Sequence, residues 1–428
     1  MTQAELEEKL NAPGREERLD ALRQLRVRLD NGEIEKPIRA EDTNNHVHTT
    51  YSFSAYSPTA AIWKAYQSGL ATVGIVDHDS VGGAEEFIEA GDILGITTTV
   101  GAEIRLSFAN TPLAGRTLNN PDEPTVAYVA CHGIPHNQIR HLDKLLSEIR
   151  EKRNLRNREQ TKRLNALLSG SGIELDFDED IVPISMAEEG GSITERHILY
   201  ALARKIVEKV GKGQPTVAFL EDTLHIPVKG KARELLQNTD YPHYEFDVLN
   251  VLKSELVPKF FIAGGEDSLP VEQVVPQLRA MGIIPCYCYL GDVGESPTGD
   301  KKAQKFEDDY LEEIFPILRD LGFEAIAYMP SRNTDAQLMR VMGDCDEFGF
   351  MEISGEDINQ PRQNFVCEKL REPRYAHLAD STWALVGHEH ETAHDPENRI
   401  YGERMHEAYP QIGDRIAYFR EIGQRYRR

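Results

Sequence analysis

The chain has 428 residues, a formal net charge of −23 and five cysteines. Its length suits one large barrel-type domain with an insertion, or two domains. The acidic charge argues against a protein that binds nucleic-acid polymers, because such binding depends on clustered lysines and arginines. The cysteines are odd in number and include no C-x-x-C pair, so no disulfide framework or zinc ribbon is indicated, and we expect most of them to be buried.

No signal-peptide pattern opens the sequence, and no apolar run approaches the length that spans a bilayer. We therefore expect a soluble, cytoplasmic protein without a membrane partner. Residues 1–40 carry leucines at helical spacing, interrupted by Pro13 and Gly14, and predict a helical appendage.

Strand patterns then alternate with helix patterns, and Ser57-Pro58 gives the first of these helices an N-cap and a proline at its first position. Strands are expected at residues 43–48, 71–76, 97–100, 125–131, 282–289, 323–329 and 350–354. Such alternation predicts parallel strands joined by right-handed crossovers. Seven of them favour an α/β fold with a closed or nearly closed TIM-like barrel, whose active sites lie at the C-terminal strand ends.

Between the fourth and fifth strands lie about 150 mostly helical residues, too many for a loop, so an inserted subdomain is expected. The predicted units are the appendage (1–40), the first barrel part (41–135), a helical insertion or lid (136–280), the second barrel part (281–370) and a C-terminal extension (371–428). The highly charged helix at 141–168 is interpreted as a solvated face.

Ligand-type side chains stand at the ends of the first three strands. They are His46 and His48, then Asp77, His78 and Asp79, then Glu103. Two imidazoles one residue apart on a strand point the same way, roughly 6–7 Å apart, and can turn onto one metal ion. The pattern predicts a metal site where the strand ends meet.

A further motif lies in the insertion, where Gly190-Gly191-Ser192-Ile193-Thr194-Glu195-Arg196-His197 predicts the start of a helix with Thr194 as its N-cap. A helix start offers free N–H groups to an anion, and Arg196 and His197 lie in the first turn. This is the strongest phosphate-contact candidate in the sequence.

These motifs, in this order, resemble those of the PHP (polymerase and histidinol phosphatase) superfamily, nearest to its small phosphoesterase branch. The residues that carry the resemblance are His46-Val47-His48, Gly74–Asp79, Gly101-Ala102-Glu103, Thr194–Ile198 and Ser354–Asn359. The resemblance covers roughly residues 43–360. It implies a distorted seven-stranded (β/α)7 barrel with two or three divalent metals at its C-terminal mouth.

The resemblance also implies roles for single residues. The first metal would be held by His46, His48, Glu103 and Asp357, with Glu103 as the bridge to a second metal. His197 resembles a ligand of the second metal. His132 is a candidate substitute for a strand-four histidine of the family pattern, which is replaced around Tyr128.

The catalytic roles follow from the same resemblance. Arg196 resembles the residue that grips the substrate phosphate, and Asn359 is a further substrate-binding candidate. Asp77 and His78 would orient ligands or move protons, and His78 also resembles part of a third metal site.

Several family ligands are replaced. Phe53-Ser54-Ala55 stands where an acid or histidine is common, Asn359 closes the last motif, and Cys288-Tyr289-Leu290 follows the fifth strand in place of Ala-His-Pro. We therefore expect one or two divalent transition metals (Mn, Zn or Fe) and a weak or empty third site.

The predicted function is metal-dependent hydrolysis of a small phosphorylated substrate, a nucleotide or sugar phosphate, by a metal-activated water. The alternative is a degenerate PHP domain that binds metal or ligand without catalysis.

A competing motif is His390-Glu391-Thr392-Ala393-His394, which satisfies the HExxH pattern of zinc proteases. That pattern requires a long helix. Here Gly387 precedes the motif and Asp395-Pro396 follows it, so we expect a polar loop, followed by a closing amphipathic helix over 401–428.

Overall fold

The computed structural model describes residues 1–121, 123–265, 267–294 and 304–428. Within them one sheet carries strands in the order β1-β2-β3-β4-β6-β7-β8, with the short β5 paired to β3. The strands are β1 (Thr43–Val47), β2 (Thr72–His78), β3 (Thr97–Ser107), β4 (Val126–His132), β5 (Leu269–Pro270), β6 (Ile284–Cys288), β7 (Ala325–Tyr328) and β8 (Met351–Ser354). Beyond β8, the Ile358 backbone bonds to the backbone of His46 and His48 in and just after β1, so the seven strands other than β5 curve into a nearly closed barrel.

Strand β4 is the exception to the predicted parallel barrel, because it runs antiparallel to both β3 and β6. The prediction of seven parallel strands is wrong here for a topological reason. Residues 108–125 connect β3 directly to β4, whereas a parallel neighbour needs a longer crossover, usually through a helix. As a result His132, at the end of β4, pairs with Ile284 where β6 begins, and Tyr128 pairs with Arg105 near the mouth.

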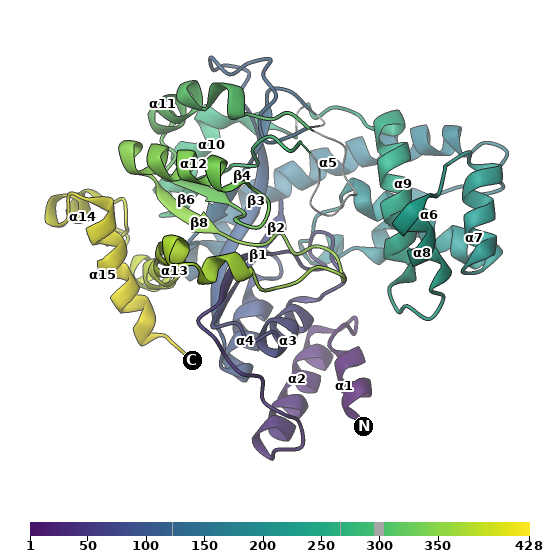
Figure 1. Cartoon of the computed structure of the whole chain (residues 1–428), viewed down its shortest axis with the longest axis horizontal. Helices are drawn as coiled ribbons and strands as arrows, with labels where there is room; N and C mark the ends of the chain where they lie inside the picture. The colour runs from purple at the N-terminus through teal and green to yellow at the C-terminus, as the bar shows by residue number, and fades with distance from the viewer. Residues whose placement is uncertain (122, 266, 295–303) are drawn as a thin grey trace.

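Helices cover the outside of the barrel (Figure 1). They are α3 (Pro58–Gln67), α4 (Ala84–Leu94), α10 (Val271–Ala280), α11 (Leu311–Leu321) and α12 (Asp335–Phe348). Helix α3 begins as predicted, since the Ser57 side chain accepts a hydrogen bond from the Ala60 N–H and Pro58 occupies the first helical position. Buried apolar residues of these helices and the outer strand faces, such as Phe87, Leu278 and Ile104, form the main core.

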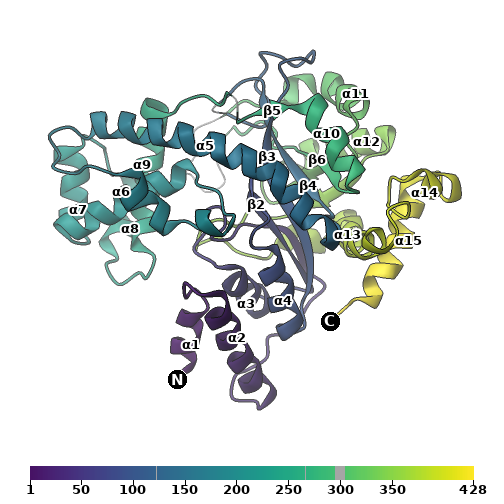
Figure 2. The same ribbon diagram turned by 180° about the vertical axis from the view of Figure 1, so that it is seen from behind.

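A helical lobe lies on one side of the barrel mouth, and α5 runs out from the barrel into it (Figures 1 and 2). Its helices are α5 (Ile139–Leu167), α6 (Glu195–Val210), α7 (Gln214–Ala218), α8 (Gly230–Gln237) and α9 (Tyr244–Phe260). The lobe has its own hydrophobic cluster, in which Leu199, Leu202 and Leu249 are fully buried. Phe53, from the loop after β1, joins that cluster and ties the barrel to the lobe.

The charged helix α5 does not present a purely solvated face. Arg150, Arg153 and Arg156 are buried at the junction between barrel and lobe, while Arg158, two residues after Arg156, is exposed. The prediction was wrong for the three buried arginines. Arg153 and Arg156 pair with buried carboxylates outside the helix, and Arg150 donates to the Asp79 carbonyl, and a charge pattern within one helix cannot reveal such partners.

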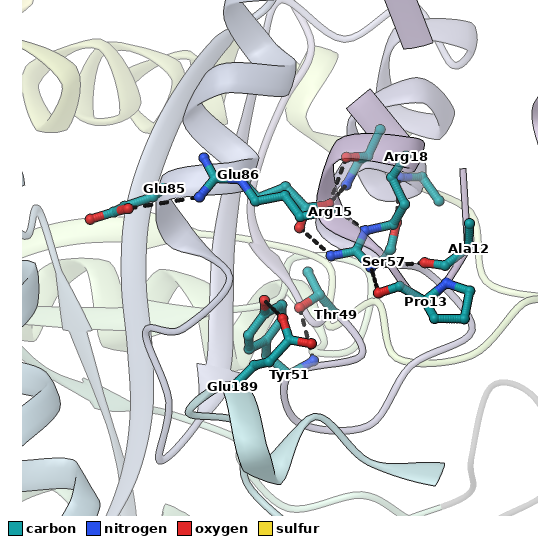
Figure 3. A network of polar contacts seen from close by, with 12 residues as sticks. Ala12, Pro13, Arg15, Arg18, Thr49, Tyr51, Ser57, Glu85, Glu86 and Glu189 are labelled. Carbon is teal, nitrogen blue, oxygen red and sulfur yellow. Dashed lines mark hydrogen bonds and ion pairs between the residues drawn. The ribbon is translucent and has the colours of Figure 1, made fainter. Parts of the chain in front are cut away.

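The N-terminal appendage, α1 (Gln3–Lys9) and α2 (Arg15–Asp30), breaks at Pro13-Gly14 as predicted and packs against α3 and α4. Figure 3 shows how it is held. The Arg18 guanidinium donates to both Glu86 oxygens at 2.8 and 2.5 Å and to the carbonyls of Ala12 and Pro13. Arg18 is only 2% exposed, so this fully bonded ion pair anchors the appendage to the barrel.

The C-terminal extension forms α13 (Ala376–His394), α14 (Glu403–Ala408) and α15 (Ile412–Arg425). The HExxH residues therefore lie in a helix, and the predicted polar loop is wrong. Gly387 misled the interpretation, because it does not break the helix. It lets α13 and α15 approach closely, and an added Cβ would lie 2.0 Å from the Phe419 carbonyl oxygen.

All five cysteines are buried and free, as predicted. None of the helices in the described ranges combines the length and the apolar character needed to cross a bilayer.

Candidate metal centre

Three predicted ligands meet at the C-terminal mouth of the barrel. His46 and His48 come from the end of β1 and Glu103 from β3, and their ligand atoms all lie within 4.8 Å of one another. The Nε2 atoms of His46 and His48 lie 3.9 and 4.0 Å from Glu103 Oε2. Separations of this size leave room for one cation between the three side chains, since metal–ligand bonds are about 2.0–2.2 Å long.

Two further predicted residues border this cluster. Asp357 Oδ1 lies 3.2 Å from His48 Nε2, and His78 Nδ1 lies 2.9 Å from Glu103 Oε2. The imidazoles of His78 and His48 pack with their centroids 4.5 Å apart. The structure thus brings His46, His48, His78, Glu103 and Asp357 together at one rim.

The close approach of the last motif to β1 depends on a glycine. A Cβ added to Gly355 would lie 2.6 Å from the His46 Cβ. Only a residue without a side chain lets the segment after β8 pass close enough to place Asp357 beside His48. Asn359 then holds that carboxylate, because its Nδ2 donates to Asp357 Oδ1 at 2.6 Å.

Burial and charge set the protonation of the cluster. Burial lowers the pKa of His46 and raises the pKa of Glu103. Burial also acts to lower the pKa of His48, but the hydrogen bond and charge of Asp357 outweigh it and raise that pKa. Although burial opposes it, the same contact with His48 holds the pKa of Asp357 well below its usual range. The contact between His48 and Asp357 therefore favours the charged form of each group.

Asp77 lies behind the cluster. Its carboxylate accepts hydrogen bonds from the Thr49 N–H at 2.7 Å and from the Thr49 and Ser52 hydroxyls at 2.6 Å. Ser52 Oγ in turn lies 3.3 Å from His48 Nδ1. Asp77 therefore fixes the loop that orients the His48 ring and leaves Nε2 to face the cavity, an arrangement common behind metal-bound histidines.

Arg196 and His197 lie in the first turn of α6, whose N-cap is Thr194 as predicted. The Arg196 guanidinium is partly exposed and has no ion-pair or hydrogen-bond partner among the described residues. Its charge acts to lower the pKa of Asp357 and opposes the rise that burial causes in the pKa of Glu103, so the guanidinium lies within electrostatic reach of the cluster. Arg196 is therefore free to bind an anion there.

Two contacts fix the ring of His197. Its Nδ1 accepts from the Thr194 N–H at 3.0 Å, and its ring packs edge-on against Phe53 with centroids 5.0 Å apart. Burial, followed by the charge of Arg153, lowers its pKa to about 3, so the ring is neutral. The structure does not group His197 with the three ligands.

Because β4 runs antiparallel to β3 and Ala130 pairs with Glu103, His132 lies two residues deeper in the barrel than the level of Glu103. It lines the same cavity as His46 and Glu103, and burial lowers its pKa to about 3. Its Nε2 is buried without a hydrogen-bond partner. His132 is not grouped with the three ligands either.

A chain of buried ion pairs stands behind the mouth and was not foreseen. Arg153 binds Asp79, which follows His78, and also Glu195, which precedes Arg196, the latter at 3.2 Å. Arg156 continues the chain from Glu195 at 3.2 Å to Asp267 at 3.1 Å. Arg105 of β3 closes it, 2.7 Å from Asp267. Three guanidinium groups and three carboxylates alternate, so the charges balance and the lobe is tied to the barrel.

The HExxH residues of α13 form no comparable site. The His390 ring stacks on Tyr426 with centroids 3.7 Å apart, and Glu391 accepts a hydrogen bond from Asn398. Across the described ranges, the only group of three or more potential ligands with this spacing is His46, His48 and Glu103.

The residues present suit a divalent cation. His48 Nε2 lies 3.2 Å from Asp357 Oδ1 and 4.0 Å from Glu103 Oε2, and two imidazoles with a carboxylate form a donor set typical of zinc, manganese and iron sites. His46, His48 and Glu103 would hold the ion, and Asp357 is close enough to join them.

Comparison with known proteins agrees with this picture. The sequence profile of the PHP domain matches residues 44–189. The chain thus carries a PHP domain. A solved structure of a candidate metal-dependent phosphoesterase from Bifidobacterium adolescentis has the same fold, with 17% identity and a TM-score of 0.50, over 79% of this chain and 96% of that one.

Two other similarities are more distant or shorter. An amidohydrolase structure from Chromobacterium violaceum is 18% identical, with a TM-score of 0.48, and covers 76% of this chain and 90% of that one. An error-prone DNA polymerase from Nocardia farcinica is 34% identical over 84 residues, which are 18% of this chain and 7% of the polymerase. The chain therefore matches only a small part of that relative.

The sequence did not reveal the residues that position the candidate ligands without belonging to a motif themselves. Ser52 and Thr49 are ordinary hydroxyl residues in the sequence, and only their contact with Asp77 reveals that they position His48. Arg153 belonged to a run of charges. The one available signal was that Asp79 and Glu195, its two partners, each adjoin a candidate functional residue.

Proposed function

We propose that the protein is a metal-dependent phosphoesterase that hydrolyses a small phosphorylated molecule, a nucleotide or a sugar phosphate. The observation that carries this proposal is the convergence of His46, His48 and Glu103 within 4.8 Å at the barrel mouth. The PHP domain and the fold shared with a candidate phosphoesterase support it. The net charge of −23 favours a small substrate over a nucleic-acid polymer.

A divalent metal held by these residues would polarise the phosphoryl group and lower the pKa of a bound water towards neutrality. Side chains of the protein bind the substrate and orient the metal ligands. Arg196, which has no side-chain partner in the described part of the chain, holds the phosphoryl oxygens with its planar guanidinium. Asp77, through Ser52, keeps the His48 ring in its orientation. His78, bonded to Glu103, fixes that carboxylate.

The test is a phosphate-release screen over nucleotides and sugar phosphates with added Mn²⁺. We expect at least one substrate to be hydrolysed, and we expect the activity to disappear in Glu103→Gln. If Mn²⁺ binds but no substrate in a broad screen releases phosphate, the enzymatic proposal is wrong.

That second outcome would support the alternative, a degenerate PHP domain that binds a metal and a ligand. One observation favours this alternative. The last motif ends in Asn359, which here donates to Asp357 and so competes with a cation for that carboxylate. Replacement of Asn359 by His would then be expected to strengthen metal binding.

A further inference from the structure

Tyr128 stands directly above the metal centre, on the same face of the sheet. In the β3–β4 ladder Glu103 pairs with Ala130, and Arg105 pairs with Tyr128. Residues opposite each other on antiparallel strands point to the same side, and residues two apart share a face. Tyr128 therefore lies one step beyond Glu103 towards the mouth, where a molecule bound to the cluster would extend.

The surroundings of Tyr128 agree with this placement. Its ring centroid lies 5.9 Å from that of His78, and the charges of Arg105, Glu195 and Glu103 all act on its hydroxyl. The side chain is half-buried, so it remains accessible from the mouth.

The hydroxyl of Tyr128 has no hydrogen-bond partner among the described residues, although the rest of the residue is bonded. Its backbone N–H and carbonyl both bond to the side chain of Asn119, at 2.7 and 2.8 Å. The neighbouring Arg105 and Arg153 are already paired with Asp267 and Asp79. The backbone of β4 is thus held in place at Tyr128, while the Tyr128 hydroxyl remains available to bind a ligand at the mouth.

We propose that the Tyr128 hydroxyl is a substrate-binding donor, which gives a hydrogen bond to a phosphoryl oxygen of the molecule bound at the metal centre. The inference rests on the proposed function and deepens it. A phenol keeps its proton at neutral pH, so it donates readily to an anion and is a poor ligand for a cation. Tyr128 would therefore contact the substrate from the position where the resemblance implies a metal-binding histidine.

Two groups would then hold the phosphate from different elements. Arg196 reaches it from α6 of the lobe, and Tyr128 reaches it from β4 of the barrel. A hydrogen bond to a charged group contributes about 1.5–3 kcal/mol, so loss of the hydroxyl should weaken phosphate binding roughly tenfold or more.

The test compares Tyr128→Phe with the wild-type protein by calorimetry, first with Mn²⁺ alone and then with inorganic phosphate added to the Mn²⁺-loaded protein. Tyr287→Phe is the matched control, because the Tyr287 hydroxyl likewise has no partner among the described residues but is buried in the main core between barrel and outer helices. We expect Tyr128→Phe to bind Mn²⁺ within about twofold of wild type and to lose phosphate affinity, and we expect the control to change neither.

Two results would overturn the inference while leaving the proposed function intact. Loss of Mn²⁺ binding in a folded Tyr128→Phe protein would make Tyr128 a metal ligand. Unchanged phosphate affinity and unchanged phosphate release would show that its hydroxyl contacts no substrate. If wild-type protein itself binds neither Mn²⁺ nor phosphate, the proposed function fails, and this inference falls with it.

Discussion

The two halves of the barrel mouth are chemically unlike. The half built by β1, β2 and β3 carries His46, His48, His78 and Glu103. The half built by β6, β7 and β8 lines the same cavity with small or uncharged residues such as Cys288, Ala327 and Gly355, and only Asp357 is charged. A cavity of about 60 Å³ lies between the halves. The candidate metal ligands are therefore concentrated on one side, and the other side provides space.

The sharpest test of this asymmetry removes one ligand from the first half. Glu103→Gln keeps the size of the side chain but replaces the charged ligand by a neutral amide, and the two imidazoles alone form an incomplete site. We expect metal content to fall from at least one transition-metal ion per chain to almost none, as measured by elemental analysis.

The matched control lies in the opposite half. Cys288 is buried, and burial raises its thiol pKa well above the usual value, so it is not a thiolate ligand. Cys288→Ala should leave the metal content unchanged. Equal losses in both variants would show that the halves do not differ as described.

A second prediction concerns the lobe that faces the ligand-bearing half. Arg196→Ala should lower the affinity of the Mn²⁺-loaded protein for inorganic phosphate by about 10- to 100-fold, because a charge-assisted contact is lost. Thermal stability should hardly change, since the guanidinium has no partner among the described residues. Arg204→Ala, an exposed arginine on the same helix, is the control. A similar loss in both variants would point to a general effect of charge.

The ion-pair chain behind the same half provides a third prediction. Glu195→Gln removes the charge that Arg153 and Arg156 share, and we expect a loss of about 3 kcal/mol in the free energy of unfolding. Arg158 lies on α5 like Arg153 and Arg156, but its ion pair with Asp178 is exposed. Asp178→Asn, which breaks that pair, should lower the free energy of unfolding by only about 0–1 kcal/mol. Denaturant unfolding measures both values.

This effect should depend on pH in a defined direction. Despite burial, the charges of Arg153 and Arg156 hold the pKa of Glu195 below its ordinary value of 4.5. A carboxyl group whose pKa is lowered on folding stabilises the folded state at pH values above its unfolded-state pKa. This stabilisation is lost as the pH falls through the folded-state pKa. The stability gap between wild type and Glu195→Gln should therefore be full at pH 7 and shrink below about pH 4.5. A gap that widens on acidification would contradict this assignment.

The smallest expected effect lies outside both halves. His394→Ala alters the HExxH motif of α13, which belongs to no ligand group in the described part of the chain. Metal content and phosphate release should match wild type. Loss of bound zinc, together with loss of a peptidase activity, would instead revive the protease alternative.

Local patterns predicted much of the fold and part of the candidate site. Apolar strand runs ending in His46, His48 and Glu103 were visible because a strand places alternate residues on one face. The Thr194 cap and the Ser57-Pro58 helix start were visible because capping depends on residues only a few positions apart. Each of these features depends only on residues within one strand or within one or two helical turns.

The sequence by itself determined that seven strands are present, that the first three carry ligand-type residues to their ends, and that a charged helix opens the insertion. Only the tertiary structure decided that β4 runs antiparallel, which carries His132 away from the mouth and Tyr128 to it. It also decided that Arg153 is buried between Asp79 and Glu195, and that Gly387 allows a close helix contact where a helix break was expected. The physical reason is common to these cases: strand direction, burial and packing distance depend on partners remote in the sequence, and no local pattern specifies those partners.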